Sequence, residues 1–407
     1  MIAACTIAGR NALAHARVTA DSFREQHPGV PFFTLLSDDP AGLFDPAGEP
    51  FTTVTLDEVA IPHLERLRFC YPQPELSYAL TPWFLGHLLD RGWRRILFLK
   101  QESLVVSTLA SLFDRLEPAA MLLTPHLLEP LDRPADLDQA AAREREILLA
   151  GVYNAGVLGV AEGRQAREFL AWWGERLSRH SLRAVEAGMH FEQRWLDFVP
   201  SFFPPVAIDR RPGSNLGHWR LPEGRIEARE GVLLVDGDPL RVARFSGFDP
   251  ERPEFLTSHH QRVRVAEMGG AGRRLVERYR AALDRADFAV TRAWPSGSSR
   301  FDDAEEIPGV VRAIYRRLGD PQVEAFGEPH RIGGGSFRAW LAERLPAPWK
   351  MARLWREIWL DRRDLQTAFP QPTGEHRRAF MLWIDRHGRA EAGLSEARWL
   401  RPRRWIG

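Results

Sequence analysis

A polar triplet, Lys100-Gln101-Glu102, interrupts an apolar stretch that runs from Arg95 to Val106. The four apolar residues before it are typical of a strand that is buried on both faces of a parallel sheet. Polar residues at the end of such a strand lie at the carboxyl edge of the sheet, where open α/β folds bind their ligands. The sequence therefore predicts a ligand site at this triplet.

The first forty residues are predicted to form a strand (2–7), a helix (12–23) and a second, parallel strand (30–36). The turn from Thr6 to Asn11 follows the first strand and is a candidate cradle for a nucleotide. It lacks the G-x-G-x-x-G fingerprint of dinucleotide-binding folds, which argues against a dehydrogenase. Asp38 follows the second strand, where its carboxylate would either meet a ribose or base or simply cap a turn.

Later segments continue this alternation of strands and helices. A helix is expected over 75–91, and Pro82 predicts that it starts near Thr81 or is kinked. The apolar run at 151–160 predicts a strand that carries Asn154, and 188–203 is expected to be one helix that carries Glu192 and Gln193. The expected fold class is α/β, with a domain over 1–265 and a mainly helical C-terminal lobe over 266–407.

Composition excludes several classes of function. The chain has 407 residues, 44% hydrophobic and 27% charged, with a formal net charge of +1, so no global field selects nucleic acid or a membrane. Its two cysteines lack metal-ligand spacing. Zinc and RNA-binding patterns and the G-x-S-x-G hydrolase motif are absent. Without a signal peptide or a run of about 18 apolar residues, the expectation is a cytoplasmic protein with no membrane span.

Four stretches, taken together, resemble the GT-A glycosyltransferases, in particular the retaining, family-8-like enzymes. The stretch RILFLKQESLVVSTLASLF looks like the segment in which a D-x-D pair holds a divalent metal, and GVYNAGVLGV looks like a strand whose Asn faces the sugar. The stretch FEQRWLDFVPSFF resembles the family's Asp-Gln segment, and RFSGFDP resembles a late segment with a metal-binding His. The order and approximate spacing agree, and the resemblance covers about residues 1–260.

This resemblance implies a GT-A fold and a nucleotide-diphosphate sugar as donor, with a glycan, protein or small molecule as acceptor. It implies that sugar transfer occurs with retention, with Gln193 beneath the anomeric carbon, Glu192 on sugar hydroxyls and Asn154 on the sugar or the acceptor. Further donor contacts are expected from residues of the first turn, the second strand, the triplet and the late segment: Thr6, Ala8, Asn11, Asp38, Glu102 and Gly247.

The chain departs from the family at the metal site. Lys100 and Glu102 stand where the two aspartates are expected, and Arg244 stands where the histidine is expected. Ammonium and guanidinium groups do not ligate hard metals, so no metal or other cofactor is expected. Three interpretations remain. Lys100 and Arg244 replace the metal by neutralising the diphosphate, or the site has decayed to a catalytically inactive nucleotide-binding or scaffold protein, or Lys100 merely ends a strand at the surface.

Overall fold

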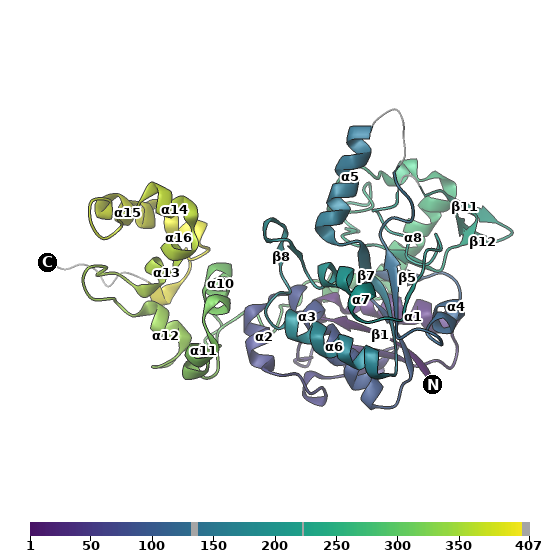
Figure 1. Ribbon diagram of the computed structural model, residues 1–407, viewed down its shortest axis with the longest axis horizontal. Coiled ribbons are helices and arrows are strands. Elements are labelled where there is room, and N and C mark those ends of the chain that lie inside the picture. Colours follow the sequence, from purple (N-terminus) through teal and green to yellow (C-terminus); the bar gives the residue numbers. More distant parts are fainter. Residues whose placement is uncertain (132–136, 222–223, 401–407) are drawn as a thin grey trace. The chain divides into compact units, whose positions relative to one another are not determined.

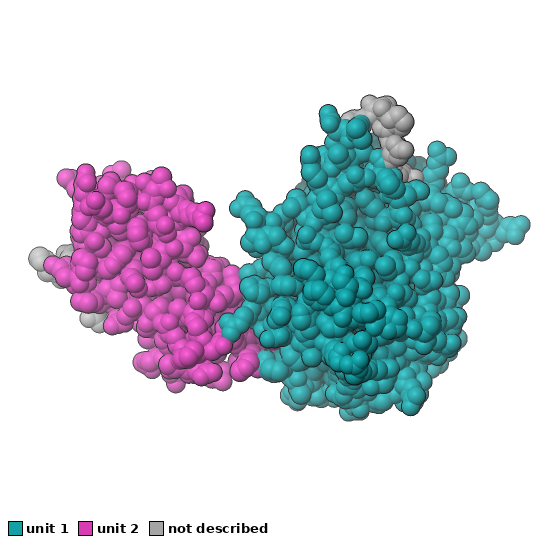
Figure 2. Space-filling model, viewed as in Figure 1, with its two compact units in different colours: residues 1–62, 73–296 teal, residues 63–72, 297–407 magenta. Residues whose placement is uncertain are grey.

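The structure is a computed structural model that describes residues 1–131, 137–221 and 224–400. The chain divides into two compact units, which Figure 2 colours separately: residues 1–62 with 73–296, and residues 63–72 with 297–407. This division differs from the expected boundary at residue 265. The reason is that α8 (Gly269–Arg285) buries Leu275 and Tyr279 in an apolar cluster with Phe245 of the first unit.

A seven-stranded sheet forms the centre of the first unit, with the order β10-β6-β7-β4-β1-β2-β3. Strand β7 runs antiparallel to both neighbours, and the other pairs are parallel. This mixed, mostly parallel sheet flanked by helices confirms the expected α/β class. The strands of the sheet are β1 (Ile2–Ala8), β2 (Phe32–Leu36), β3 (Thr52–Val54), β4 (Arg95–Leu99), β6 (Met121–Pro125), β7 (Tyr153–Ala161) and β10 (Val206–Ile208).

Helices cover both faces of this sheet (Figure 1). Alternate residues of a strand point to opposite faces, and Leu97 and Leu99 of β4 pack in one cluster with α1 (Leu13–Gln26) and α4 (Ala110–Arg115). On the other face, α3 (Glu75–Asp90) contacts β1 and β4 and packs against α6 (Arg164–Leu177). The helix expected over 75–91 is confirmed as α3, and of the two alternatives for Pro82 the start near Thr81 is wrong, because α3 begins at Glu75 and passes through Pro82, which lacks the N–H of one backbone hydrogen bond.

Short elements complete the first unit. Strand β5 (Ser103–Val105) follows the polar triplet and pairs with β14 (Val242–Arg244) in a separate antiparallel ribbon. The single helix expected over 188–203 is wrong, since Phe191 has a left-handed φ of 53° that interrupts it. That segment instead contains β9 (Met189–His190), a 3-10 helix (Gln193–Phe198) and α7 (Val199–Phe202). The remaining elements are α5 (Leu137–Ala150), β8 (Arg183–Ala184), β9 (Met189–His190), β11 (Ile226–Arg229), β12 (Val232–Val235), β13 (Asp238–Pro239) and α9 (Phe288–Thr291).

The second unit is helical, as expected for the C-terminal region, although α2 (Leu64–Cys70) from early in the chain belongs to it. Its core packs Phe69 against Tyr315 and Phe337, with ring centroids 4.6 and 5.8 Å away. Its other helices are α10 (Gly309–Arg317), α11 (Asp320–Phe326), α12 (Phe337–Ala342), α13 (Arg353–Asp361), α14 (Arg363–Ala368), α15 (Arg377–Trp383) and α16 (Arg389–Glu391). Across the described part of both units, no helix combines the length and the hydropathy needed to cross a bilayer.

Candidate functional site

Lys100 lies directly after β4 and is held inside the protein. Its backbone N–H donates to Gly156 O of β7, and the residue as a whole is only 8% exposed. Its ammonium Nζ is 2.5 Å from Glu192 Oε1 and 3.8 Å from the centre of the Tyr78 ring. Burial lowers the pKa of Lys100, and the neighbouring Glu192 carboxylate opposes that shift. The interpretation of Lys100 as a surface residue is therefore wrong.

Arg244 reaches the same place from β14. It lies opposite Ser103 in the β14–β5 ribbon, and its Nη1 donates to Lys100 O and to Ser103 Oγ, both at 2.8 Å. Its Nη2 is 3.7 Å from Glu102 Oε2, and Gly247 N donates to Glu102 Oε1 at 3.3 Å. The loop after β4 and the segment after β14 thus meet around Glu102.

The charges of this cluster balance. Lys100 pairs with Glu192 and Arg244 faces Glu102, so two formal positive charges meet two formal negative charges. A divalent-metal site needs several oxygen or imidazole ligands that are not already matched by cations. Throughout the described ranges, no group of three or more His, Cys, Asp or Glu side chains is arranged to hold a metal ion. The residues at this position do not fit the metal site of the GT-A enzymes that the sequence resembles.

Asn154 of β7 is at the centre of a buried amide network. Its Oδ1 accepts from Gly156 N at 2.8 Å and from Asn215 Nδ2 at 3.1 Å, and its Nδ2 donates to His126 Nε2 at 3.0 Å. The last bond requires neutral His126 with its proton on Nδ1, and burial lowers the pKa of His126 to about 4. These bonds use most of the hydrogen-bonding capacity of Asn154. Its side chain therefore holds its neighbours in position and has little capacity left to bind a ligand.

Gln193 is also held by the protein. Its Nε2 donates to Ala150 O at 2.9 Å and lies 3.3 Å from His190 Nδ1. Its Oε1 makes only long contacts of 3.4 Å, to Asn154 Nδ2 and to Ala155 N. The amide oxygen is therefore the atom of Gln193 that can most easily accept a hydrogen bond from a ligand.

Glu192 differs from these amides because part of it lacks a partner. Its backbone carbonyl accepts from Trp173 Nε1 at 3.1 Å, which anchors the residue. The side chain is 1% exposed, and beyond the Lys100 ion pair its Oε2 has no hydrogen-bond partner within the described residues. A buried carboxylate oxygen in this state is costly unless a ligand or water donates to it. Glu192 Oε2 is therefore suited to accept a hydrogen bond from a hydroxyl group.

The predicted nucleotide turn lies at the carboxyl ends of β1 and β2. Thr6 and Ala8 are fully buried within β1, so contacts to a nucleotide there fall to the residues after the strand, Gly9 to Asn11. A side chain on Gly9 would come within 3.0 Å of both Asn11 Oδ1 and Asp38 Oδ2, which places these two residues together. Asp38 also accepts a 3.4 Å hydrogen bond from Arg10 N.

Helix α3 connects this turn to the Lys100 cluster. Ser77 donates to Gln73 Oε1 at 2.7 Å, and Gln73 Nε2 donates to Ser37 Oγ, next to Asp38, at 2.6 Å. The residue after Ser77 is Tyr78, whose ring covers the Lys100 ammonium. The predicted donor residues and the predicted catalytic residues are thus linked through the first turns of one helix.

Several residues of the site belong to none of the motifs that the sequence shows. Tyr78 and Asn215 have isolated positions in the sequence and contact the cluster only through the fold. His218 and His260 lie nearby, with Nδ1 and Nε2 2.9 Å apart, and burial and then the His260 neighbour lower the pKa of His218. The adjacent pair His259-His260 is the one sequence feature that would have pointed to this group.

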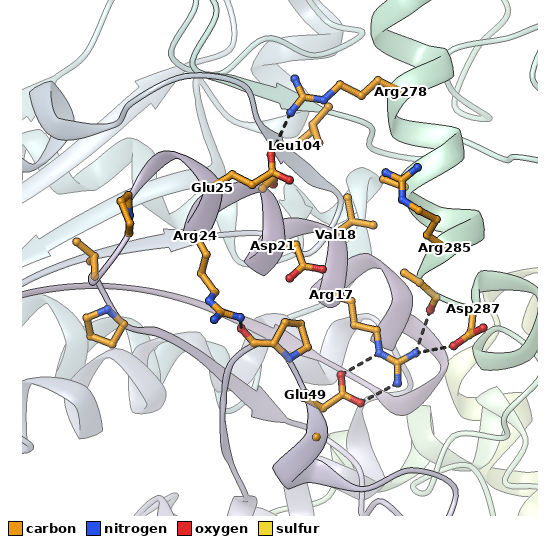
Figure 3. A pocket seen from close by; sticks show the side chains of 18 of the residues that line it. Arg17, Val18, Asp21, Arg24, Glu25, Glu49, Leu104, Arg278, Arg285 and Asp287 are labelled. Atoms are coloured by element: carbon orange, nitrogen blue, oxygen red, sulfur yellow. Dashed lines mark hydrogen bonds and ion pairs between the residues drawn. The ribbon is translucent and has the colours of Figure 1, made fainter.

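A large cavity lies elsewhere in the first unit, between α1 and α8 (Figure 3). It has a volume of about 1140 Å³ and contains none of the predicted site residues. Arg17 crosses it to Glu49, with two hydrogen bonds of 2.7 and 2.8 Å, and also donates to Ala286 O. These bonds tie α1 to the loop before β3 and to the end of α8, so this set of charges has a structural explanation.

No protein-family model matches the chain. Over 253 residues it is 24% identical to the uncharacterized protein YfnF of Bacillus subtilis (strain 168), a match that covers 60% of this chain and 80% of YfnF. YfnD of the same organism is 23% identical over 209 residues, covering 49% of this chain and 62% of YfnD.

The chain is also similar to solved structures of glycosyltransferases. The galactosyltransferase LgtC, in complex with donor and acceptor sugar analogs, is 14% identical with a TM-score of 0.41, covering 70% of this chain and 96% of LgtC. The glycosyltransferase GlyE of Streptococcus pneumoniae TIGR4 is 13% identical with a TM-score of 0.41, covering 74% and 67%. Mouse xyloside xylosyltransferase 1 is 11% identical with a TM-score of 0.36, covering 60% and 97%.

Proposed function

We propose that the chain is a glycosyltransferase that moves a sugar from a nucleotide-diphosphate donor to an acceptor hydroxyl, with retention and without a bound metal. One observation carries the proposal. Four segments that are far apart in the sequence, and that resemble the four motifs of retaining GT-A enzymes, meet in one buried polar cluster beyond β4. Their contact points are Lys100 with Glu192, Arg244 with Glu102, and Asn154 with Gln193.

The proposed chemistry divides the cluster into two parts. Lys100 and Arg244 donate charge-assisted hydrogen bonds to the leaving diphosphate, as such groups do at developing oxyanions. Glu192 Oε2 accepts a hydrogen bond from a hydroxyl of the donor sugar, and the Gln193 amide oxygen lies beneath the anomeric carbon. The bond from that carbon to the phosphate oxygen breaks, the acceptor oxygen bonds to the carbon from the same face, and its proton passes to the leaving phosphate.

Donor hydrolysis and donor binding test this proposal together. The full chain is incubated with UDP-, GDP-, ADP-, CDP- and dTDP-sugars in EDTA and in Mn²⁺, and released nucleoside diphosphate is measured by chromatography. We expect release from at least one donor at similar rates in both buffers. A strict requirement for Mn²⁺ contradicts the metal-independent part, and absence of binding to every donor, measured by calorimetry at millimolar concentration, contradicts the whole proposal.

The variant Lys100→Met separates phosphate recognition from base recognition. Its binding of the nucleoside diphosphate should weaken at least tenfold, because a charge-assisted hydrogen bond is lost, while its binding of the nucleoside stays unchanged. Equal losses for both ligands would remove Lys100 from the phosphate site. Donor binding without any turnover would favour the alternative of a catalytically inactive nucleotide-binding protein.

A further inference from the structure

The buried cluster has hydrogen-bond donors for a diphosphate but no surplus of positive charge. Lys100 is matched by Glu192 and Arg244 by Glu102. A nucleoside diphosphate carries at least two negative charges, and burying them beside a neutral cluster is costly unless a further cation approaches. The electrostatics therefore call for another positive group at the margin of this site.

The β8–β9 hairpin, whose strand β8 is labelled in Figure 1, begins with an arginine, Arg183. Arg183 lies directly opposite His190 in this hairpin, and Phe191 N donates to Leu182 O at 2.9 Å to close the pairing. Directly opposed residues of an antiparallel pair have their side chains on the same face. His190 uses that face to contact Gln193, with Nδ1 and Nε2 3.3 Å apart. Arg183 therefore belongs to the face of the hairpin that meets the site.

The electrostatic neighbours of two histidines support this placement. Burial, then Lys100 and then Arg183 lower the pKa of His190 to about 4. Burial also lowers the pKa of His259, where Glu102 opposes the shift and Arg183 adds to it. The guanidinium thus acts on groups from two different segments, one beside Lys100 and the other beside Glu102.

Arg183 is also available to a ligand. The residue is exposed, and it has no ion pair or hydrogen-bond partner within residues 1–131, 137–221 and 224–400. Lys100 and Arg244, by contrast, are 8% and 4% exposed and are already engaged. A planar guanidinium with free donors is the side chain best suited to bind phosphate oxygens in two places.

We propose that Arg183 binds the diphosphate of the donor from the β8–β9 hairpin and supplies the positive charge that the buried cluster lacks. This inference rests on the proposed function, since it concerns the same donor site. It assigns the external side of the diphosphate to Arg183 and the internal side to Lys100 and Arg244. The hairpin then contributes a ligand contact through β8 and leads directly into Glu192 and Gln193 through β9.

The test compares Arg183→Gln with Arg164→Gln, which removes the same charge from the start of α6, where Arg164 is exposed and pairs with the exposed Glu168. Binding of UDP, GDP, ADP, CDP and dTDP, of inorganic pyrophosphate and of the corresponding nucleosides is measured by calorimetry on the full chain. We expect Arg183→Gln to weaken diphosphate and pyrophosphate binding about tenfold to a hundredfold, with nucleoside binding unchanged. Arg183→Lys should recover part of the loss, because it restores the charge but not the planar fork.

The outcomes separate the two proposals. If the unmodified chain binds a diphosphate and Arg183→Gln binds it as tightly as Arg164→Gln does, the assignment of Arg183 is wrong while the proposed function stands. Equal weakening of nucleoside and diphosphate would also overturn the assignment, because it indicates a disturbed hairpin. If the unmodified chain binds none of the nucleoside diphosphates, the proposed function and this inference are both wrong.

Discussion

The buried Lys100–Glu192 pair makes a quantitative prediction about stability. The two charges are 2.5 Å apart and their side chains are 10% and 1% exposed. At an effective dielectric constant of 20, Coulomb's law gives about 7 kcal/mol of attraction at that distance. Desolvation of both ions offsets most of this, but removing one partner leaves the other charge buried and should cost about 3–5 kcal/mol.

The two single substitutions should differ in cost. Lys100→Met leaves the Glu192 carboxylate almost fully buried and without a cation, so we expect the larger loss. Glu192→Gln leaves an ammonium against the Tyr78 ring, where a cation–π contact of about 1 kcal/mol remains. Because burial already lowers the pKa of Lys100, this ammonium can also lose its proton. The double substitution should cost less than the sum of the two by about 1–3 kcal/mol.

The assay has to report on the first unit alone, because a chain of two units need not unfold in one step. Amide hydrogen exchange of β4 and β7 peptides in urea meets this requirement. The matched control is the double cycle of Arg95→Met and Glu117→Gln, a pair 2.7 Å apart that starts from the same strand but is 27% and 65% exposed. Its coupling should stay below about 1 kcal/mol. If the Lys100–Glu192 coupling is no larger than this, the buried ion pair does not exist as described.

Two further predictions concern the surroundings of this pair. A Cβ at position 156 would lie 2.6 Å from Arg244 Nε, so Gly156→Ala should destabilise the first unit by about 1–3 kcal/mol in urea unfolding. The control is Gly86→Ala in α3, where an added Cβ meets no atom within 4 Å, so this change should be neutral or stabilising. Similar losses of stability for both variants would contradict the close packing of Gly156 against Arg244. The pKa of His126 is about 4 in the folded protein and 6.5 in an unfolded chain. Between pH 4 and pH 6.5 the unfolded chain therefore binds one proton more than the folded protein at this residue. The contribution of His126 to the folding equilibrium should therefore be lost as pH falls from 6.5 towards 4, by up to tenfold per pH unit. His126→Gln should flatten this slope and the exposed His180→Gln should not.

Elements whose residues alternate or repeat on a single face were predictable from the sequence. The strands β1, β2 and β4 and the helix α1 lie close to their expected positions, because continuous apolar runs and helical spacing report burial directly. The segment around Glu192 was not predictable in the same way. Its apolar spacing fits a helix, but the left-handed Phe191 and the tertiary bond from Trp173 to Glu192 O select a hairpin and a 3-10 turn.

The candidate site shows the same division. Local pattern was enough to place Lys100 at the end of a buried strand and Asn154 within another. It could not show that Asn154 is saturated by His126 and Asn215, because those partners come from other strands and loops. Nor could it show which carboxylate matches which cation, since that depends on distances between segments that are far apart in the sequence.

The sequence by itself determined that a cation stands where a polar triplet leaves the central strand, since residue identity and hydrophobic pattern are local properties. Only the tertiary structure decided what that cation does electrostatically. It pairs Lys100 with Glu192 and places Arg244 beside Glu102, and it leaves Arg183 exposed on the neighbouring hairpin. The physical reason is that charge interactions depend on distance and burial, and both are set by how the sheet, the ribbon and the hairpin pack together.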